Sequence, residues 1–218
     1  QLQEVSTISV SFVDKIMKSL KPKLLEQNLG NLEIEKLLNT AFLGTGIYFE
    51  HGIGGESVRD DFAEVGILQG YVYENGRIVI EYANYFYEVF DEPLLWNNFT
   101  HVCKIIIAHE LVHKNQIRKM KRNLSYIPAV DRSNNTKYLS NKMEIEAFAR
   151  EAVEDYLGKG YKKKQILQML RTPNGDSNQS SKEESNAMYY YYDYFHGYEP
   201  KIWNRFVMYM VQHLRSTK

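Results

Sequence analysis

Residues 94–113, LLWNNFTHVCKIIIAHELVH, form the stretch that decides how this chain folds. Apolar residues recur through it at helical spacing, at positions 95, 99, 102, 103, 106 and 107. This spacing predicts one long helix over 94–120 with a wide buried face, and Asp91-Glu92-Pro93 is typical of a helix start. The segment HELVH, residues 109–113, then places three polar side chains among Ile and Leu. These side chains need partners there, because an unpartnered buried polar group is costly.

The spacing within HELVH suits a metal site. On a helix, residues four apart point the same way, so His109 and His113 can place two imidazole nitrogens on one Zn²⁺ at about 2.0–2.1 Å. Glu110 is rotated by about 100° from His109, which keeps its carboxylate off the metal but near a water bound there. Glu110 can therefore act as general base toward that water. The alternative is a pair of histidines without a metal, because HExxH also arises by chance.

A catalytic zinc site also needs a third protein ligand and one open position. The extended motif HExxHxxGxxH does not supply that ligand, since Gln116 replaces its glycine and Lys119 replaces its last histidine. The best source is MEIEAFAREA, residues 143–152, which is expected to begin a second helix. Glu144 and Glu146 are about 200° apart on a helix, so only one can face the metal. The other candidates are His51, His101, His196 and His213.

HELVH followed by E144-I-E-A147 resembles the gluzincin branch of HExxH metallopeptidases, in which a glutamate on a second helix completes the zinc site. The resemblance implies zinc held by His109, His113 and Glu144, with Glu110 as general base. Glu146 is the alternative third ligand. Glu144 also has a structural alternative, because Asn141-x-x-Glu144 approximates a capping box at a helix start.

The resemblance covers residues 77–157 in layout but only a few residues in motif. The pairing of HELxHxxQ with ExEA is also similar to small phage- and bacterium-encoded proteins, and Gln116 fits the Q of that pattern. Many families place an aspartate four residues after the ligand glutamate, whereas this chain has Phe148. No residue that would support a ligand histidine is therefore identified.

Gluzincins commonly hold the substrate backbone against an edge strand, and the resemblance assigns that role to the strand RIVIEY, residues 77–82. A donor to the oxyanion is also implied, typically Tyr, His or Arg. Tyr194, His196 and Tyr198 are the main candidates, next to Tyr191 in the same tyrosine-rich segment. The alternative is that this segment forms an aromatic core face. Tyr126 and Tyr138 compete for the donor role.

The predicted fold class is α+β: one mostly helical, zincin-like domain over 1–218 with a small antiparallel sheet before the long helix. Asn75-Gly76 between two apolar runs predicts a β-hairpin with a type I′ turn, and a short strand is expected at 46–50. The segments are a helical N-terminal part (1–43), a catalytic core (44–157) and C-terminal helices (158–218). Further helices are expected at 8–29, with a break or kink at Pro22, and at 31–43, 141–157, 161–171, 181–195 and 200–215; residues 122–140 are expected to be loop.

Composition excludes several other classes. Lys plus Arg equals Asp plus Glu at 27 each, so no global charge favours nucleic acid or an anionic membrane as partner. The single cysteine, Cys103, excludes a Cys-based zinc site and is expected to be buried. A soluble protein is expected, cytoplasmic or virus-encoded rather than secreted. The expected function is a zinc metalloendopeptidase-like hydrolase acting on proteins or peptides; the alternative is a catalytically silent zincin-fold binding or structural protein, such as a phage-encoded component.

Overall fold

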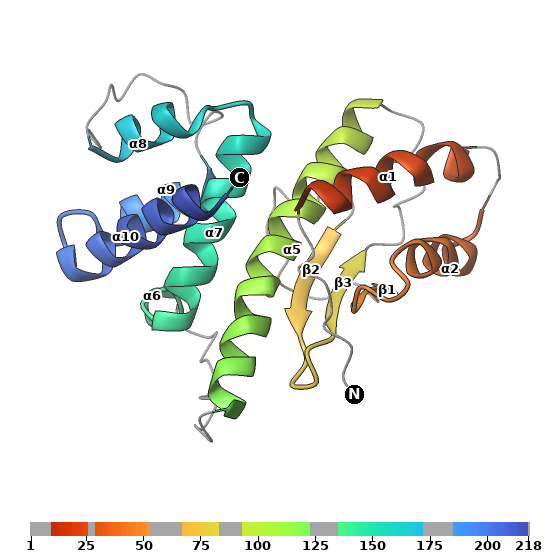
Figure 1. Cartoon of the computed structure of the whole chain (residues 1–218), viewed down its shortest axis with the longest axis horizontal. Helices are drawn as coiled ribbons and strands as arrows, with labels where there is room; N and C mark the ends of the chain where they lie inside the picture. The colour runs from red at the N-terminus through yellow and green to blue at the C-terminus, as the bar shows by residue number, and fades with distance from the viewer. Residues whose placement is uncertain are drawn as a thin grey trace. The chain divides into compact units, whose positions relative to one another are not determined.

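The computed structural model describes residues 10–25, 29–52, 67–82, 93–122, 135–171 and 185–217 (Figure 1). The chain forms two compact units, residues 1–118 and 119–218, whose boundary falls inside the longest helix. Each unit is therefore described by itself. The division into segments 1–43, 44–157 and 158–218 stays a prediction.

The first unit combines three helices with a small sheet. Its elements are α1 (Val10–Leu25), α2 (Asn31–Ala41), β1 (Ile47–His51), β2 (Ile67–Val72), β3 (Ile78–Tyr82) and α5 (Pro93–Arg122). The long helix, the hairpin and the strand near 46–50 are confirmed. Of the predicted break or kink at Pro22, the break is wrong, because α1 continues three residues beyond Pro22 to Leu25; the kink stays a prediction.

The sheet has the order β1-β3-β2 and is mixed. Strand β2 pairs antiparallel with β3, as the hairpin predicts, whereas β1 pairs parallel with β3. The strand RIVIEY was expected to offer an edge to a substrate, and this is wrong because β3 is hydrogen-bonded on both sides. The three apolar residues Ile78, Val79 and Ile80 are all fully buried, which suits a central strand. In the described sheet, β1 and β2 are the two edge strands.

The hairpin turn also differs from the predicted type I′ turn. The Gly76 N–H donates to the Tyr73 carbonyl at 2.8 Å, so the turn centres on Glu74 and Asn75 rather than on Asn75 and Gly76. Gly76 follows with φ 84°, a left-handed conformation that glycine adopts without strain. This is the three-residue hairpin loop with a closing glycine. The Lys114 side chain of α5 lies against this glycine, with Cε 3.5 Å from where a Cβ would stand.

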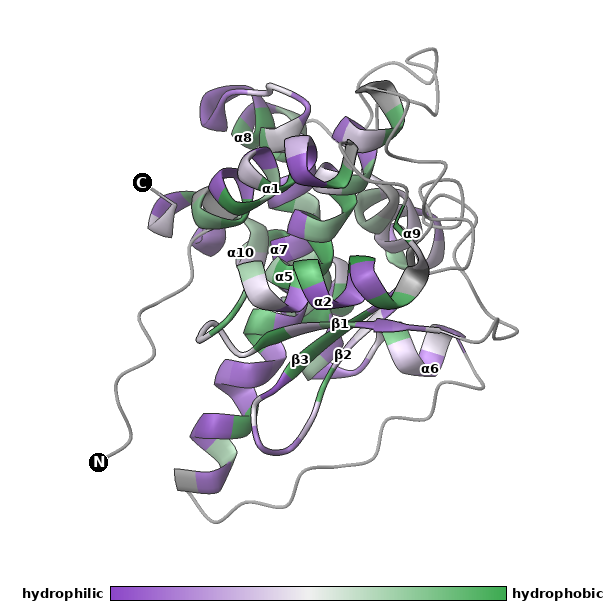
Figure 2. Ribbon diagram, turned by 90° about the vertical axis from the view of Figure 1, so that its right-hand side faces the viewer, coloured by the Kyte–Doolittle hydropathy of each residue, from purple (hydrophilic) through white to green (hydrophobic). Residues whose placement is uncertain are grey.

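The core of the first unit lies on one face of the sheet. Alternate residues of β1 and β3 point there and meet apolar residues of the three helices, and Cys103 is buried among them as predicted. Figure 2 shows this hydrophobic colouring in β3 and in the middle of α5, with hydrophilic residues in the last turns of α5. The central members of the core are Phe49, Ile80, Tyr82, Phe99 and Ile107. Burial of this apolar face fixes the rotation of α5 about its axis.

Strand β2 approaches α5 very closely at Gly70. A Cβ atom at this position would stand 2.2 Å from Cγ2 of Ile106 and 3.5 Å from Cγ of Glu110. Only glycine fits such a spacing, since real Cβ atoms do not approach neighbours within 3.0 Å. The edge strand therefore runs directly against the turn of α5 that carries Glu110.

We expect Gly70→Ala to destabilise the protein by about 1–3 kcal/mol, because the added methyl group overlaps a β-branched side chain that cannot swing away. Chemical denaturation of the variant measures this loss. Adding Gly70→Ala to an Ile106→Ala background should cost much less, because the overlapping Cγ2 is gone. An equal cost in both backgrounds would contradict the close approach.

Helices are the only regular secondary structure in the described residues of the second unit. Its elements are α6 (Asn135–Leu139), α7 (Lys142–Gly158), α8 (Lys163–Arg171), α9 (Asn186–Phe195) and α10 (Pro200–Ser216). The prediction of loop over 122–140 is wrong for α6, a short helix whose Leu139 is buried. Tyr191 and Phe206 stack at the centre of this unit with ring centroids 4.1 Å apart. Part of the tyrosine-rich segment thus forms an aromatic core.

The α+β fold class is confirmed, with most described residues in helices and a three-stranded sheet before the long helix. Across the described ranges, no helix combines the length and the hydrophobicity needed to cross a membrane.

Candidate metal centre

His109 and His113 lie one turn apart on α5 with their rings turned toward each other. Their Nε2 atoms are 3.1 Å apart, and the ring centroids are 4.8 Å apart at an interplanar angle of 69°. The rings keep this arrangement because the same stretch of helix is anchored by buried apolar neighbours, including Ile107 and Val112. His109 is itself buried, and His113 is half-buried.

The separation of the two nitrogens fits a shared metal ion. Two ligands at about 2.0–2.1 Å from a tetrahedral zinc ion stand about 3.3 Å apart. The observed 3.1 Å between the Nε2 atoms is close to that value. A metal could therefore bind both nitrogens with little rearrangement of the rings.

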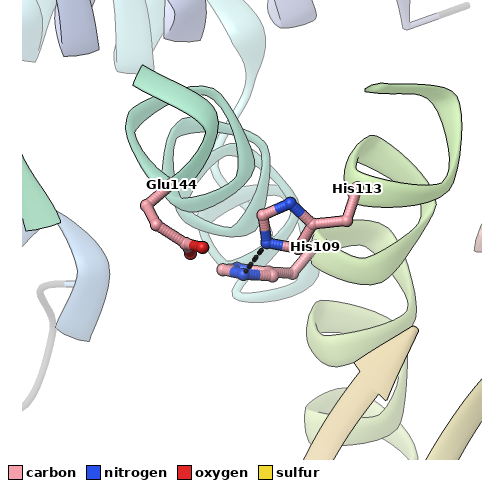
Figure 3. A group of neighbouring side chains, drawn as sticks. All are labelled: His109, His113 and Glu144. Carbon is pink, nitrogen blue, oxygen red and sulfur yellow. Dashed lines mark hydrogen bonds between the residues drawn. The ribbon is translucent and has the colours of Figure 1, made fainter. Parts of the chain in front are cut away.

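Glu144 completes a group that could hold a metal ion. One ligand atom from each of His109, His113 and Glu144 lies within 4.8 Å of the other two (Figure 3). Among the residues that the structure describes, this is the only such group of three or more His, Cys, Asp or Glu side chains. Two imidazoles and one carboxylate form a donor set that divalent transition metals accept.

The start of α7 explains how Glu144 is placed on its helix. The Asn141 side chain is the N-cap and accepts a hydrogen bond from the Met143 N–H at 2.9 Å. Glu144 is then in the first helical turn, and its side chain is only 4% exposed. A surface capping carboxylate would be more exposed, so burial favours the metal-binding role over the capping-box role.

Glu110 occupies a different side of α5 from the histidines. Its carboxylate Oε1 is 3.7 Å from the position of a Cβ at Gly70, which puts it beside the edge strand β2. The side chain is buried, with 7% exposed. Glu110 is therefore a neighbour of the two histidines that faces the sheet edge.

Gln116 is a member of the site to which the sequence analysis gave no role. Its Oε1 is 2.9 Å from Nδ1 of His113, and the side chain is buried. The expected support for a ligand histidine was an aspartate four residues after Glu144, where this chain has Phe148. The sequence signal that could have identified Gln116 was its spacing from His113, because residues three apart on a helix are neighbours.

The alternative third ligands lie in other surroundings. Nε2 of His213 is 3.3 Å from the backbone carbonyl of Glu146, and burial lowers the pKa of His213 below its usual value, with Arg150 adding to the effect. His51 packs edge-on against Tyr82, with centroids 5.6 Å apart. Neither His101 nor Glu146 belongs to the metal-binding group found among the described residues.

The predicted oxyanion donors are distributed over the end of α9 and the turn after it. His196 stacks on Tyr192 with centroids 4.4 Å apart, Tyr194 is partly exposed, and Tyr198 is 82% exposed. Tyr191 is buried instead: its hydroxyl donates to the Leu139 carbonyl at 2.7 Å. Burial raises the pKa of Tyr191, and the nearby Glu144 carboxylate raises it further. The oxyanion role stays a prediction; Tyr138 packs edge-on against Phe148, and Tyr126 lies outside the described residues.

Comparison with known proteins gave no match to a family model, to a curated protein or to a solved structure.

We expect the metal-free protein to take up one divalent ion, measured by titration with Zn²⁺ and by elemental analysis. His109→Ala and His113→Ala should each weaken binding by at least about 100-fold, the upper end of what losing an outer-shell partner costs. His101→Ala, on the same helix, is the matched control and should bind normally. Undiminished binding by both ligand variants would contradict the site.

Proposed function

We propose that this protein is a zinc-dependent peptidase. The observation that carries the proposal is the arrangement around α5: a histidine pair within a group that could hold a metal ion, and a buried glutamate beside a sheet edge. The resemblance of HELVH and ExEA to gluzincins supports the same function. His109, His113 and Glu144 would hold the metal, and Glu110 would act as general base.

The proposed reaction is hydrolysis of a peptide bond. When bound, Zn²⁺ lowers the pKa of water and polarises the scissile carbonyl. Glu110 accepts a proton from the attacking water, whose oxygen adds to the carbonyl carbon. The carbon–nitrogen bond then breaks, and Glu110 returns the proton to the leaving amine.

Strand β2 is the proposed support for the substrate backbone. It is an edge strand of the described sheet, and a Cβ at its Gly70 would stand only 3.5 Å from Cγ of Glu110. An extended peptide that pairs with β2 would add one strand to the sheet. This pairing would set the scissile carbonyl near Glu110, with the peptide held through main-chain hydrogen bonds.

Glu110→Gln should lower the rate of peptide cleavage by about 10²–10⁴-fold, the usual contribution of a general base. Mass spectrometry of a mixed peptide pool measures cleavage, and water enriched in a heavy oxygen isotope should label each new C-terminus. Zn²⁺ affinity should stay near that of the unaltered protein, because the carboxamide keeps the size of the side chain. Glu33→Gln, on the exposed face of α2, is the control and should cleave normally.

The outcomes separate the peptidase from a non-enzymatic binding protein. Cleavage that persists in Glu110→Gln would come from a contaminant or from another group. Bound metal without any cleavage that depends on Glu110 would favour the binding protein. Absence of bound metal would contradict both the peptidase and the metal-binding protein.

If the peptide pairs with β2, only every second amide of the substrate should donate a hydrogen bond to the strand. The Glu110→Gln protein is used because it should bind the peptide without cleaving it. N-methylation of a peptide amide that faces β2 removes one hydrogen bond, which contributes roughly 0.5–1.5 kcal/mol net. Binding of the methylated peptide should therefore be about 2- to 10-fold weaker. Methylation of the next amide, which faces away, should have little effect. Calorimetric titration of a series of singly methylated peptides measures this, and equal losses at every position would contradict strand addition.

A further inference from the structure

We infer that Gln116 is a positioning residue that sets the tautomer and the orientation of His113 for metal binding. This inference rests on the proposed metal site but concerns a residue with no part in coordination. It depends on the first unit alone, through one turn of α5. The side chains involved are His109, His113 and Gln116.

The geometry of the contact is specific to one ring nitrogen. Gln116 follows His113 by three residues, so the two side chains lie on the same side of α5. The amide Oε1 is 2.9 Å from Nδ1, while Nε2 of the same ring is 3.1 Å from Nε2 of His109. One nitrogen of His113 thus faces Gln116, and the other faces the position of the metal.

The chemistry of the two groups decides which nitrogen carries the hydrogen. A carbonyl oxygen only accepts, so a hydrogen bond to Oε1 requires the hydrogen on Nδ1. A neutral imidazole has a single N–H, so Nε2 is left with a lone pair for the metal. The opposite amide orientation would donate to Nδ1 and place the hydrogen on Nε2, which would block coordination. Metal binding and acceptance by Oε1 therefore favour each other.

Burial makes this contact effective. Gln116 is 8% exposed, in a helix turn where water competes little for either partner. A ligand histidine is usually supported by a carboxylate or a carbonyl, and such support is worth about 10–100-fold in metal affinity. The carboxamide provides the acceptor without adding a negative charge to this buried turn of α5. Gln116 can thus orient His113 at a small desolvation cost.

The test compares Gln116→Met, which keeps the length of the side chain but has no acceptor, with Gln116→Glu, which keeps an acceptor. Competition with a chromophoric chelator measures Zn²⁺ affinity in the full chain. We expect Gln116→Met to bind about 10–100-fold more weakly, and Gln116→Glu to stay within about threefold of the unaltered protein or above it. Asn115→Met, at the neighbouring exposed amide, should bind normally.

Two further readouts distinguish positioning from simple packing. Thermal unfolding of the metal-free protein should be nearly the same for Gln116→Met and the unaltered chain. Nitrogen NMR of the zinc-bound protein should show a slowly exchanging Nδ1–H on His113 that exchanges faster in Gln116→Met. Undiminished Zn²⁺ affinity in Gln116→Met would overturn the inference. So would a loss of Zn²⁺ affinity that is matched by a loss of stability and is not restored in Gln116→Glu. Either result would leave the peptidase proposal standing. Absence of Zn²⁺ binding by the unaltered protein would overturn both.

Discussion

The 3.1 Å approach of the two Nε2 atoms in α5 is the constraint on which the rest of the site depends. Two imidazoles can be held at the spacing of one shared ion only if their helix is continuous and cannot rotate. Both conditions follow from apolar burial: α5 runs from Pro93 to Arg122, and its buried face packs on one side of the sheet. The core of the first unit therefore supports the candidate metal site, although none of its apolar residues would touch a metal.

Gly70 extends the same constraint to the sheet. Because a Cβ there would overlap Ile106, the backbone of β2 comes closer to α5 than any other residue would permit. The closeness has a cost, since glycine lowers the stability of a strand. The close approach places the edge strand β2 next to the Glu110 carboxylate. A substrate strand placed on that edge would be oriented by main-chain hydrogen bonds before any side-chain recognition.

The sequence predicted the elements that depend on local periodicity. The spacing of apolar residues identified α5, and Asn75-Gly76 identified the hairpin. The sequence did not predict the order of the strands, because tertiary packing decides it. Strand β3 is central because β1, from a distant part of the chain, pairs with it. A single run of apolar residues does not show which of its sides will gain a partner strand. In the site, helix geometry predicted the histidine pair and the gluzincin resemblance favoured Glu144, with Glu146 left as the alternative; the structure groups Glu144 with the two histidines.

The positions of the site residues along α5 place them on two adjacent faces of the helix. At about 100° per residue, His109, His113 and Gln116 fall within a sector of about 60°, while Glu110 lies some 60° beyond the edge of that sector. Ile106, which meets Gly70, lies between His113 and Glu110 in the same projection. One face of the helix thus carries two of the three residues that could hold a metal ion, together with Gln116, and the adjacent face carries Glu110 and the contact with β2. Under the proposed function, a substrate on β2 would meet Glu110 and an ion held by the histidines from the same side. Three turns of one anchored helix thus carry every residue of the candidate site except Glu144 and the contact from β2, which explains why a short motif identifies most of it.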